Sequence, residues 1–171
     1  MTASVTIRPA IPTDLAPLTE ILNFYVRETA ITFDEQLWEP EQKRAWFDTY
    51  EERGPYRMLI AEEGERVLGV AYSSCYREHP AFRETVEASI YLAPYARTRG
   101  VGSRLYSALF DALASEPVHR AVVGIALPND ASIALHRKFG FREIGVFNEY
   151  AIKRGVRISS VWMEKAIRGS F

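Results

Sequence analysis

Two glycines and two arginines crowd into one short segment near the middle of the chain. The stretch RTRGVGS, residues 97–103, lies between a run that alternates like a strand and a run with helical periodicity. A phosphate-binding loop needs backbone N–H groups that face the anion, glycines where side chains would block it, and a helix N-terminus behind them. This segment offers all three, with Gly100 and Gly102 as the glycines and Arg97 and Arg99 as cations. An ordinary strand-to-helix turn explains these residues equally well.

The spacing of this segment disfavours two common phosphate loops. A Walker-type loop needs Gly-x-x-x-x-Gly-Lys-Ser/Thr, but Ser103 and Arg104 follow Gly102 here. A dinucleotide-binding fingerprint needs a third glycine and a position near the first strand. The sequence therefore argues against an ATPase and against a dehydrogenase.

The composition limits the class of protein further. The 171 residues fit one domain with a single core. The formal net charge is −1, and the acidic and basic residues are spread along the chain, so we expect no nucleic-acid partner. A single cysteine, Cys75, and three scattered histidines predict neither a disulfide nor a metal site. The N-terminal residues do not resemble a signal peptide and no apolar run could span a membrane, so we expect a cytoplasmic protein.

The hydrophobic pattern predicts an α/β chain with one order of elements. A strand and two helices come first, then three strands, a helix, a strand, a helix and two strands. We expect turns at Gly64 and at Gly155, between paired strands. Strands are expected over residues 5–10, 56–63, 66–76, 84–94 and 119–127 and twice within 142–167, and helices over 13–28, 40–53, 102–115 and 129–141.

The pattern Arg-x-x-Gly-x-Gly from Arg97 to Gly102 resembles the pyrophosphate loop of the GNAT N-acetyltransferase superfamily, whose members bind acetyl-CoA. The order of elements matches that fold across nearly the whole chain. The stretch PNDASIALHRKFGF, residues 128–141, resembles the second CoA segment of the family. More narrowly, TVEASIYL, GVGSRLYSALF and LPNDASIALHRKFGF are similar to the phosphinothricin acetyltransferase branch, which includes enzymes acting on methionine sulfoximine and methionine sulfone.

The resemblance implies a fold, a donor and a partner. It implies a single GNAT domain over residues 1–171, with a mixed, mostly antiparallel sheet of about seven strands flanked by about four helices. It also implies acetyl-CoA as co-substrate without a metal, a small amine as acceptor, and a homodimer. The residues expected to bind the cofactor are Ile90, Tyr91, Leu92, Arg97, Arg99, Gly100, Val101, Gly102, Ser103, Asn129 and Ser132.

Three residues are candidates for proton transfer. Acetylation needs an amine without its extra proton, and Glu87, on the polar face of the strand before the loop, matches the proposed catalytic glutamate of the branch. His136 lies where much of the superfamily has a tyrosine, and we expect it either to donate to the leaving thiolate or to assist Glu87. Tyr106 is a further candidate near the reacting centre. A solvated carboxylate, a structural histidine and a packed tyrosine remain the alternatives.

Four residues are candidates for binding the acceptor. Arg77 and Arg83 flank the loop before Glu87, where an arginine could pair with the carboxylate of an amino acid. Phe33 matches an aromatic residue that walls the substrate pocket of the branch, and Tyr76 holds an aromatic position there. Ordinary packing is the alternative for both rings.

The end of the chain departs from the branch. The branch commonly has Gly-x-Lys-x-Gly-x-Trp-x-Asp, but this sequence has Ala151, Arg157 and Ser159 in place of the Gly, Trp and Asp. These changes put phosphinothricin itself in doubt as the acceptor. Two other functions stay open from the sequence: acetylation of a protein N-terminus, a lysine or a polyamine, and a regulatory module that binds CoA without catalysis.

Overall fold

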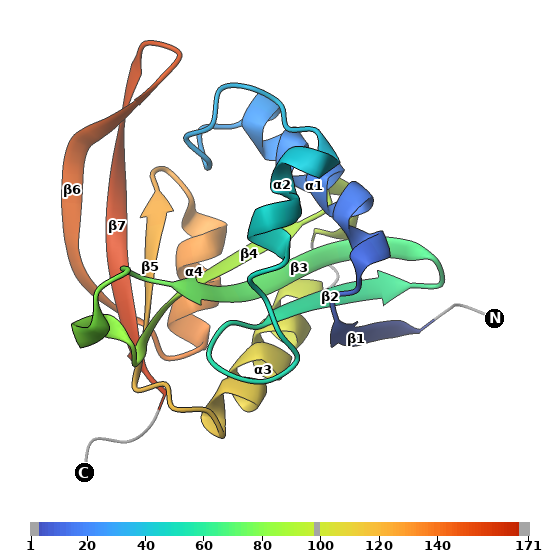
Figure 1. Ribbon diagram of the computed structural model, residues 1–171. Helices are drawn as coiled ribbons and strands as arrows, with labels where there is room; N and C mark the ends of the chain where they lie inside the picture. Colours follow the sequence, from blue (N-terminus) through green and yellow to red (C-terminus); the bar gives the residue numbers. More distant parts are fainter. Residues whose placement is uncertain (1–3, 98–99, 168–171) are drawn as a thin grey trace.

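The computed structural model describes residues 4–97 and 100–167, and the predicted order of strands and helices is confirmed across them (Figure 1). The strands are β1 (Val5–Pro9), β2 (Met58–Glu63), β3 (Arg66–Cys75), β4 (Thr85–Leu92), β5 (Arg120–Ala126), β6 (Arg142–Lys153) and β7 (Val156–Ala166). The helices are α1 (Leu15–Glu28), α2 (Pro40–Phe47), α3 (Val101–Ala114) and α4 (Asp130–Lys138).

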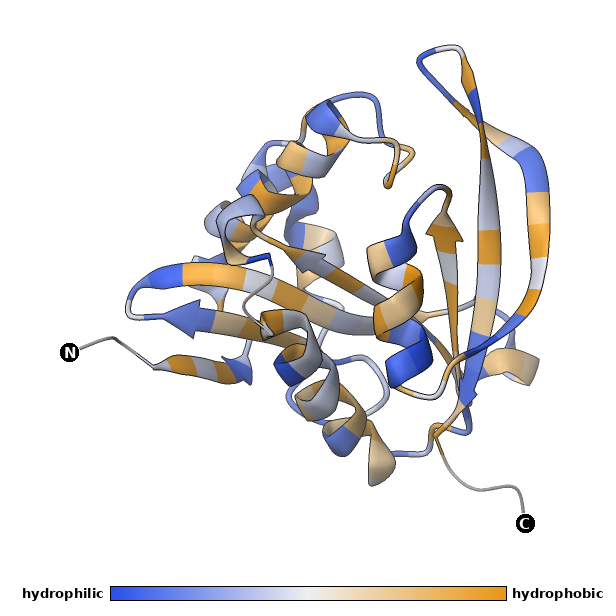
Figure 2. Ribbon diagram, turned by 180° about the vertical axis from the view of Figure 1, so that it is seen from behind, coloured by the Kyte–Doolittle hydropathy of each residue, from blue (hydrophilic) through white to orange (hydrophobic). Residues whose placement is uncertain are grey.

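The strands form one sheet in the order β1-β2-β3-β4-β5-β7-β6. All neighbouring strands are antiparallel except β4 and β5, which are parallel and are connected through α3. Two opposite views show α1 and α2 on one face of the sheet and α3 and α4 on the other (Figures 1 and 2). The predicted α/β (α+β) fold, with a mixed and mostly antiparallel sheet, is therefore confirmed.

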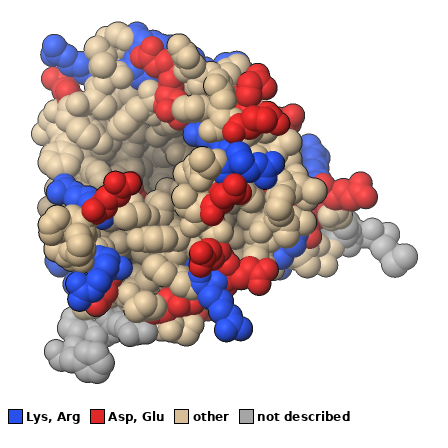
Figure 3. Space-filling model, viewed as in Figure 1, with Lys and Arg blue, Asp and Glu red and all other residues tan. Residues whose placement is uncertain are grey.

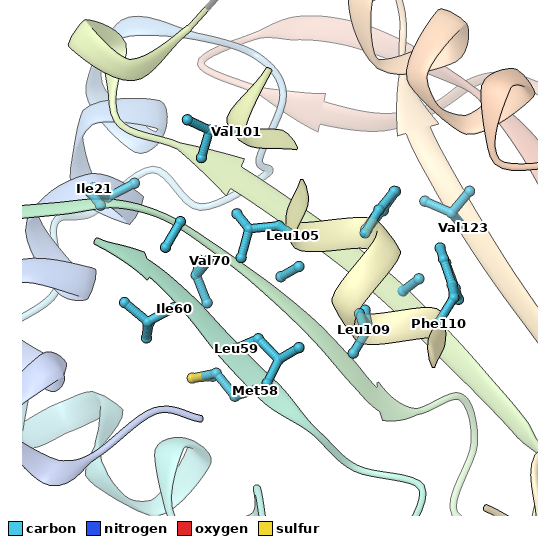
Figure 4. Packing of buried hydrophobic residues seen from close by; sticks show 14 of the residues in the cluster. Ile21, Met58, Leu59, Ile60, Val70, Val101, Leu105, Leu109, Phe110 and Val123 are labelled. Atoms are coloured by element: carbon cyan, nitrogen blue, oxygen red, sulfur yellow. The ribbon is translucent and has the colours of Figure 1, made fainter. Parts of the chain in front are cut away.

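The core lies largely between the sheet and α3. Val101, Leu105 and Leu109 follow one another at helical spacing along α3, and all three are buried. They face buried side chains of β2 and β3, among them Ile60 and Val70 (Figure 4). Full burial of each such aliphatic side chain contributes about 1.5–3 kcal/mol to the stability of the fold. None of the helices in the described residues is long and apolar enough to cross a membrane.

The second helix is shorter than its sequence pattern predicts. We expected it to run over residues 40–53, but α2 ends at Phe47. The hydroxyl of Thr49 donates to the carbonyl of Trp46 at 2.7 Å, and the N–H of Tyr50 donates to the carbonyl of Phe47. These local bonds replace the helical pattern and end the helix.

The two central strands are paired at one end only. The pairing of β4 with β5 covers residues 85–87 and 120–122. Beyond these pairs β4 continues to Leu92 beside β3, and β5 continues to Ala126 beside β7. The sheet is therefore split between β4 and β5, and each half keeps its outer neighbours.

Candidate active site

The split between β4 and β5 forms a cavity of about 540 Å³. Its lining includes Tyr25 of α1 on one face of the sheet and Leu135 of α4 on the other. The surface is hollowed beside the β6–β7 hairpin, and mostly uncharged side chains surround the hollow (Figure 3). The predicted site residues that line the cavity are Glu87, Ile90, Tyr91, Leu92, Arg97, Tyr106, Asn129, Ser132 and His136.

The backbone of β4 presents polar groups to the split. Ala93, next to the end of β4, donates its N–H to the Leu68 carbonyl of β3 at 2.9 Å. Because successive strand residues direct their N–H groups to opposite sides, those of Ile90 and Leu92 point away from β3 and toward the gap. The Leu92 carbonyl points the same way and accepts a hydrogen bond from the Tyr25 hydroxyl at 2.6 Å. This edge of β4 can therefore bind a carbonyl or an oxyanion.

Glu87 lies where the split begins. It pairs with Val122 of β5 at the last position before the strands separate, and it is one of the residues that line the cavity. On the other side it pairs with Ser74 of β3. Burial raises the pKa of the Glu87 carboxyl above its ordinary value. A carboxylate with a raised pKa is a stronger base, as general base catalysis near neutral pH requires.

Tyr106 of α3 and His136 of α4 form a buried hydrogen-bonded pair. The Tyr106 hydroxyl lies 2.7 Å from Nε2 of His136. Nδ1 of His136 lies 2.7 Å from the Ser132 carbonyl, which can only accept, so Nδ1 carries the proton of the neutral ring. Nε2 therefore accepts from the Tyr106 hydroxyl. Burial lowers the pKa of His136 and raises that of Tyr106, so both groups are uncharged near neutral pH.

The start of α4 places two predicted cofactor residues at the cavity. Asn129 is the N-cap of α4, and its side-chain oxygen accepts a hydrogen bond from the N–H of Ser132 at 3.2 Å. Both residues line the cavity. The capping role that the sequence left open for Asn129 is thus present, and it sets the amide group at the cavity wall.

The glycine-containing segment forms the start of α3. Gly100 precedes the helix with a φ of +73°, a left-handed conformation that glycine adopts without strain. A Cβ atom at Gly100 would meet nothing within 4 Å, so the space beside it is open. Val101 and Gly102 are buried in the first turn, and Ser103 accepts a hydrogen bond from Lys138 of α4 at 2.8 Å.

Arg97 brings a positive charge to the cavity, whereas Arg99 lies outside the described residues. The Arg97 guanidinium is 5.3 Å from the ring centre of Phe24 and 5.4 Å from that of Tyr25. Both distances are within cation–π range. Two aromatic rings of α1 therefore help to orient this cation beside the segment that leads into α3.

The four residues predicted to bind the acceptor are not among those that line the cavity. Tyr76 and Arg77 follow the end of β3, and the Arg77 guanidinium lies 5.1 Å from the Tyr76 ring centre. Arg83 is exposed and forms an ion pair of 3.8 Å with Glu84. Phe33, in the segment between α1 and α2, has its ring 6.0 Å from that of Tyr150 on β6.

The Tyr76 ring nevertheless lies close to the cavity wall. Its centre is 6.3 Å from the ring of Trp162 on β7. Trp162 pairs with Gly124 of β5, which lines the cavity, and a Cβ atom at Gly124 would lie 2.9 Å from the indole. Tyr76 therefore lies near Trp162, which packs against the cavity wall, and Arg77 lies beside Tyr76.

The tip of the β6–β7 hairpin is tied to the segment that follows α1. Lys153 is buried, and its ammonium donates to the carbonyls of Thr29 at 2.7 Å and Thr32 at 2.8 Å. The N–H of Arg154 donates to the Glu35 carboxylate at 2.6 Å. Since Thr29 lines the cavity, the hairpin holds one end of the cavity wall in place.

The three positions that depart from the branch lie on this hairpin, outside the cavity lining. Ala151 pairs with Ile158, and Arg157 is exposed near the turn. The hydroxyl of Ser159 accepts a hydrogen bond from the N–H of Glu149 at 2.9 Å. All three positions therefore lie on the hairpin and apart from the residues that line the cavity.

Sequence reasoning missed several parts of the wall. Tyr25, Thr29 and Ile31, at the end of α1 and just beyond it, line the cavity, as do residues 123–126 of β5. The apolar run of β5 predicts a buried strand, but it gives no sign of the split. The contact of Lys138 with the start of α3 was also missed, because it joins two segments far apart in sequence.

Comparison with known proteins agrees with this geometry. Residues 18–141 match the model of the acetyltransferase (GNAT) family. The chain is 48% identical to the phosphinothricin N-acetyltransferase of Streptomyces coelicolor, over 97% of this chain and 98% of that protein. It is 33% identical to the L-methionine sulfoximine/L-methionine sulfone acetyltransferase of Salmonella typhimurium, over 94% of this chain and 93% of that protein.

A solved structure shows the same likeness. The structure of yncA from Salmonella typhimurium, determined with its cofactor acetyl-CoA, matches this chain with a TM-score of 0.91 and 31% identity. The match covers 97% of this chain and 95% of that one. The predicted resemblance to the superfamily and to its phosphinothricin and methionine sulfoximine branch is confirmed. The chain therefore belongs to the acetyltransferase (GNAT) family.

Proposed function

We propose that this protein transfers the acetyl group of acetyl-CoA to the amine of a small amino-acid-like acceptor, of the phosphinothricin, methionine sulfoximine or methionine sulfone type. The observation that carries the proposal is the cavity in the split sheet, which joins Glu87, the free edge of β4 and the Tyr106–His136 pair. The names of the relatives at 48% and 33% identity support this class of acceptor. The acetyl-CoA bound to yncA supports the donor.

The cavity fits acetyl-CoA in two ways. The pantetheine arm carries amide groups, which can pair with the Ile90 carbonyl and the Leu92 N–H on the open edge of β4 as an added strand would. The diphosphate is an anion and fits the start of α3, where Gly100 leaves open space and Arg97 adds charge. The N–H groups of the first turn of α3, from Val101 to Ser103, point toward the same anion.

Glu87 acts as the general base in this proposal. An ammonium has no lone pair, so the acceptor amine must lose a proton to react. The Glu87 carboxylate takes this proton, directly or through water, as the amine nitrogen bonds to the acetyl carbon. Acetyl-CoA supplies the acetyl group in activated form, as a thioester.

Backbone groups and the buried pair complete the machinery. The N–H of Ile90, which is closer to Glu87 along β4 than Leu92 is, stabilises the negative charge that develops on the acetyl oxygen. Tyr106 is our candidate for the proton donor to the thiolate that leaves when the C–S bond breaks, because its hydroxyl can turn its proton from Nε2 of His136 to the sulfur and then regain a proton from water. His136, whose own proton is bound to Ser132, orients that hydroxyl.

Arg77 is our candidate for binding the carboxylate of the acceptor. It lies over Tyr76, which contacts Trp162 beside the cavity wall. Phe33 adds an apolar surface near Tyr150 at the hairpin. Arg83 is a weaker candidate, because it already pairs with Glu84.

A panel assay tests the proposal. Release of free thiol from acetyl-CoA is measured with proteinogenic amino acids, methionine sulfone, methionine sulfoximine and phosphinothricin as acceptors. We expect turnover with at least one of these compounds. Turnover with none of them would refute the acceptor class, and binding of CoA without acetylation of any amine would identify a non-catalytic module.

We further propose that the protein acts as a homodimer through β6. This strand is the edge of the sheet, and its residues 142–150 are exposed. It exposes apolar side chains, which appear as an orange stretch along the outer strand of the hairpin in Figure 2. An exposed apolar edge strand is a typical site for association. The exposed apolar residues of the hairpin are Ile144, Val146, Phe147, Tyr150, Ile152 and Val156.

A further inference from the structure

The split requires a partner for the polar backbone groups of β4 that would otherwise pair with β5. Leu92 lies at the end of β4, five residues beyond Glu87, the last residue paired with β5. Its carbonyl points toward the gap and needs a hydrogen-bond donor there, since a carbonyl withdrawn from water without a hydrogen bond is costly. The Tyr25 hydroxyl supplies this bond at 2.6 Å. A side chain of α1 thus takes the place that β5 leaves vacant.

Tyr25 is held firmly in this position. Tyr25 is 6% exposed and lies in the last turn of α1. Its ring contacts the ring of Tyr91 at 5.2 Å and that of Phe24 at 5.4 Å, both edge to face. The same ring lies 5.4 Å from the Arg97 guanidinium. One side chain therefore contacts the end of β4 and the cation that we assign to the diphosphate.

We propose that Tyr25 is a positioning residue for the cofactor, which holds the open edge of β4 in register with the pantetheine amides. This inference rests on the proposed function, because it concerns how the same cavity binds acetyl-CoA. With the carbonyl of Leu92 tied to Tyr25, the N–H groups of Leu92 and Ile90 keep a fixed spacing and direction. A preorganised strand edge loses less conformational freedom when a ligand pairs with it, and so it binds more tightly.

The chain offers a closely matched control for this residue. Tyr95 lies in the short 3-10 turn Pro94–Ala96, and its hydroxyl donates to the carbonyl of Val67 on β3 at 2.7 Å. The Arg66 guanidinium lies 3.5 Å from the centre of its ring. Tyr95 thus makes the same two kinds of contact as Tyr25, but it is not part of the cavity lining.

The experiment compares Tyr25→Phe and Tyr95→Phe with the unchanged protein. The dissociation constants of CoA and of adenosine 3′,5′-bisphosphate are measured by calorimetry, and the melting temperature is measured without ligand. The second probe shares the phosphorylated adenosine of CoA but lacks the pantetheine arm. We expect Tyr25→Phe to raise the dissociation constant of CoA about tenfold, equivalent to about 1.4 kcal/mol, and to leave the affinity for the bisphosphate unchanged. Tyr95→Phe should leave both affinities unchanged.

Three outcomes would overturn the inference, and they can be told apart. Equal CoA affinity in Tyr25→Phe and in the unchanged protein would show that the hydroxyl does not position β4. If Tyr25→Phe bound both CoA and the bisphosphate more weakly by the same factor and melted at a lower temperature than Tyr95→Phe, the role of Tyr25 would be purely structural. Failure of the unchanged protein to bind CoA at all would refute the proposed function, and the inference with it.

Discussion

The hydroxyl of Tyr106 lies 2.7 Å from Nε2 of His136, and this bond joins α3 to α4 inside the cavity wall. The tautomer of His136 follows from its other nitrogen, which must donate to the Ser132 carbonyl. The direction of each proton in the pair is therefore defined by one backbone carbonyl. We therefore propose Tyr106 rather than His136 as the donor to the sulfur, because only the Tyr106 proton is free of a backbone carbonyl.

Tyr106→Phe tests this proposal. The substitution keeps the ring and its contacts with Phe110 and Phe139, but it removes the proton donor. Turnover should fall by about 10²-fold, within the usual range for acid–base groups. The free energy of unfolding should fall by about 1–3 kcal/mol, because Nε2 of His136 loses its partner. Steady-state kinetics and urea unfolding check both; an unchanged kcat would exclude Tyr106 as the donor.

The lowered pKa of His136 predicts how stability depends on pH. Burial depresses the pKa of the folded state below that of the unfolded chain, so the unfolded chain binds more protons between the two values. Stability should therefore be complete above the unfolded pKa of about 6.5 and should decrease as the pH falls toward the folded value. Urea unfolding at several pH values measures this. In His136→Gln the decrease should be smaller, and an equally steep decrease would contradict the assignment.

Glu87→Gln should lower kcat by about 10²–10⁴-fold, as loss of a general base does. The affinity for acetyl-CoA should stay nearly unchanged, because the amide occupies the same space. In the unchanged protein the rate should rise as the pH passes through the raised pKa of Glu87, since the base acts when deprotonated. This rise should be absent in Glu87→Gln. A pH–rate profile and a binding isotherm check the prediction; a collapse of the affinity would indicate a structural role.

Alanine substitutions at two glycines with positive φ can distinguish an effect on cofactor binding from an effect of backbone strain. Gly100 has a φ of +73° at the start of α3, and Gly64 has a φ of +62° in the turn between β2 and β3. An alanine at either position costs about 1–2 kcal/mol of stability. Only Gly100→Ala should also lower the affinity for acetyl-CoA, because its Cβ projects into the open space assigned to the diphosphate. Calorimetry measures the affinities, and a similar loss in Gly64→Ala would show that strain alone is responsible.

If the protein is a dimer through β6, a single charged substitution on β6 should halve its molecular mass in solution. Ile144 on β6 is 58% exposed, so Ile144→Lys should not disturb the core of one chain. A charge there should oppose association, and light scattering coupled to size exclusion should report a monomer. Ile11, which is 46% exposed before α1, gives a matched control, Ile11→Lys, that should remain dimeric. A monomeric unchanged protein would refute the dimer.

Local sequence patterns predicted the elements of this fold well. The alternation of Val86, Glu87 and Ala88 predicts β4, and the apolar residues of α3 predict the helix that covers it. These signals lie within one element, where periodicity and capping act. The cofactor segments were predicted by resemblance, and Arg97 and Asn129 do line the same cavity.

The split of the sheet and the acceptor end of the cavity could not be predicted in this way. At the separated end of β4 the Leu92 carbonyl is bonded by Tyr25, sixty-seven positions away, and no pattern in either segment encodes the contact. Arg83 was proposed from its place beside Glu87 in sequence, but its side chain lies against Glu84 instead. The end of α2 depended on a side-chain bond of Thr49. Each of these features arises from particular tertiary or side-chain contacts.

The bonds of Lys153 to the carbonyls of Thr29 and Thr32 have a consequence for how this enzyme family can diversify. They make one wall from two segments at opposite ends of the chain, neither of which belongs to the segments that we assign to CoA. We therefore expect substitutions in the hairpin to change the choice of acceptor while the donor half of the molecule stays constant. On this proposal, a new amine could be accommodated by changes in one hairpin, with the acetyl-transfer chemistry retained.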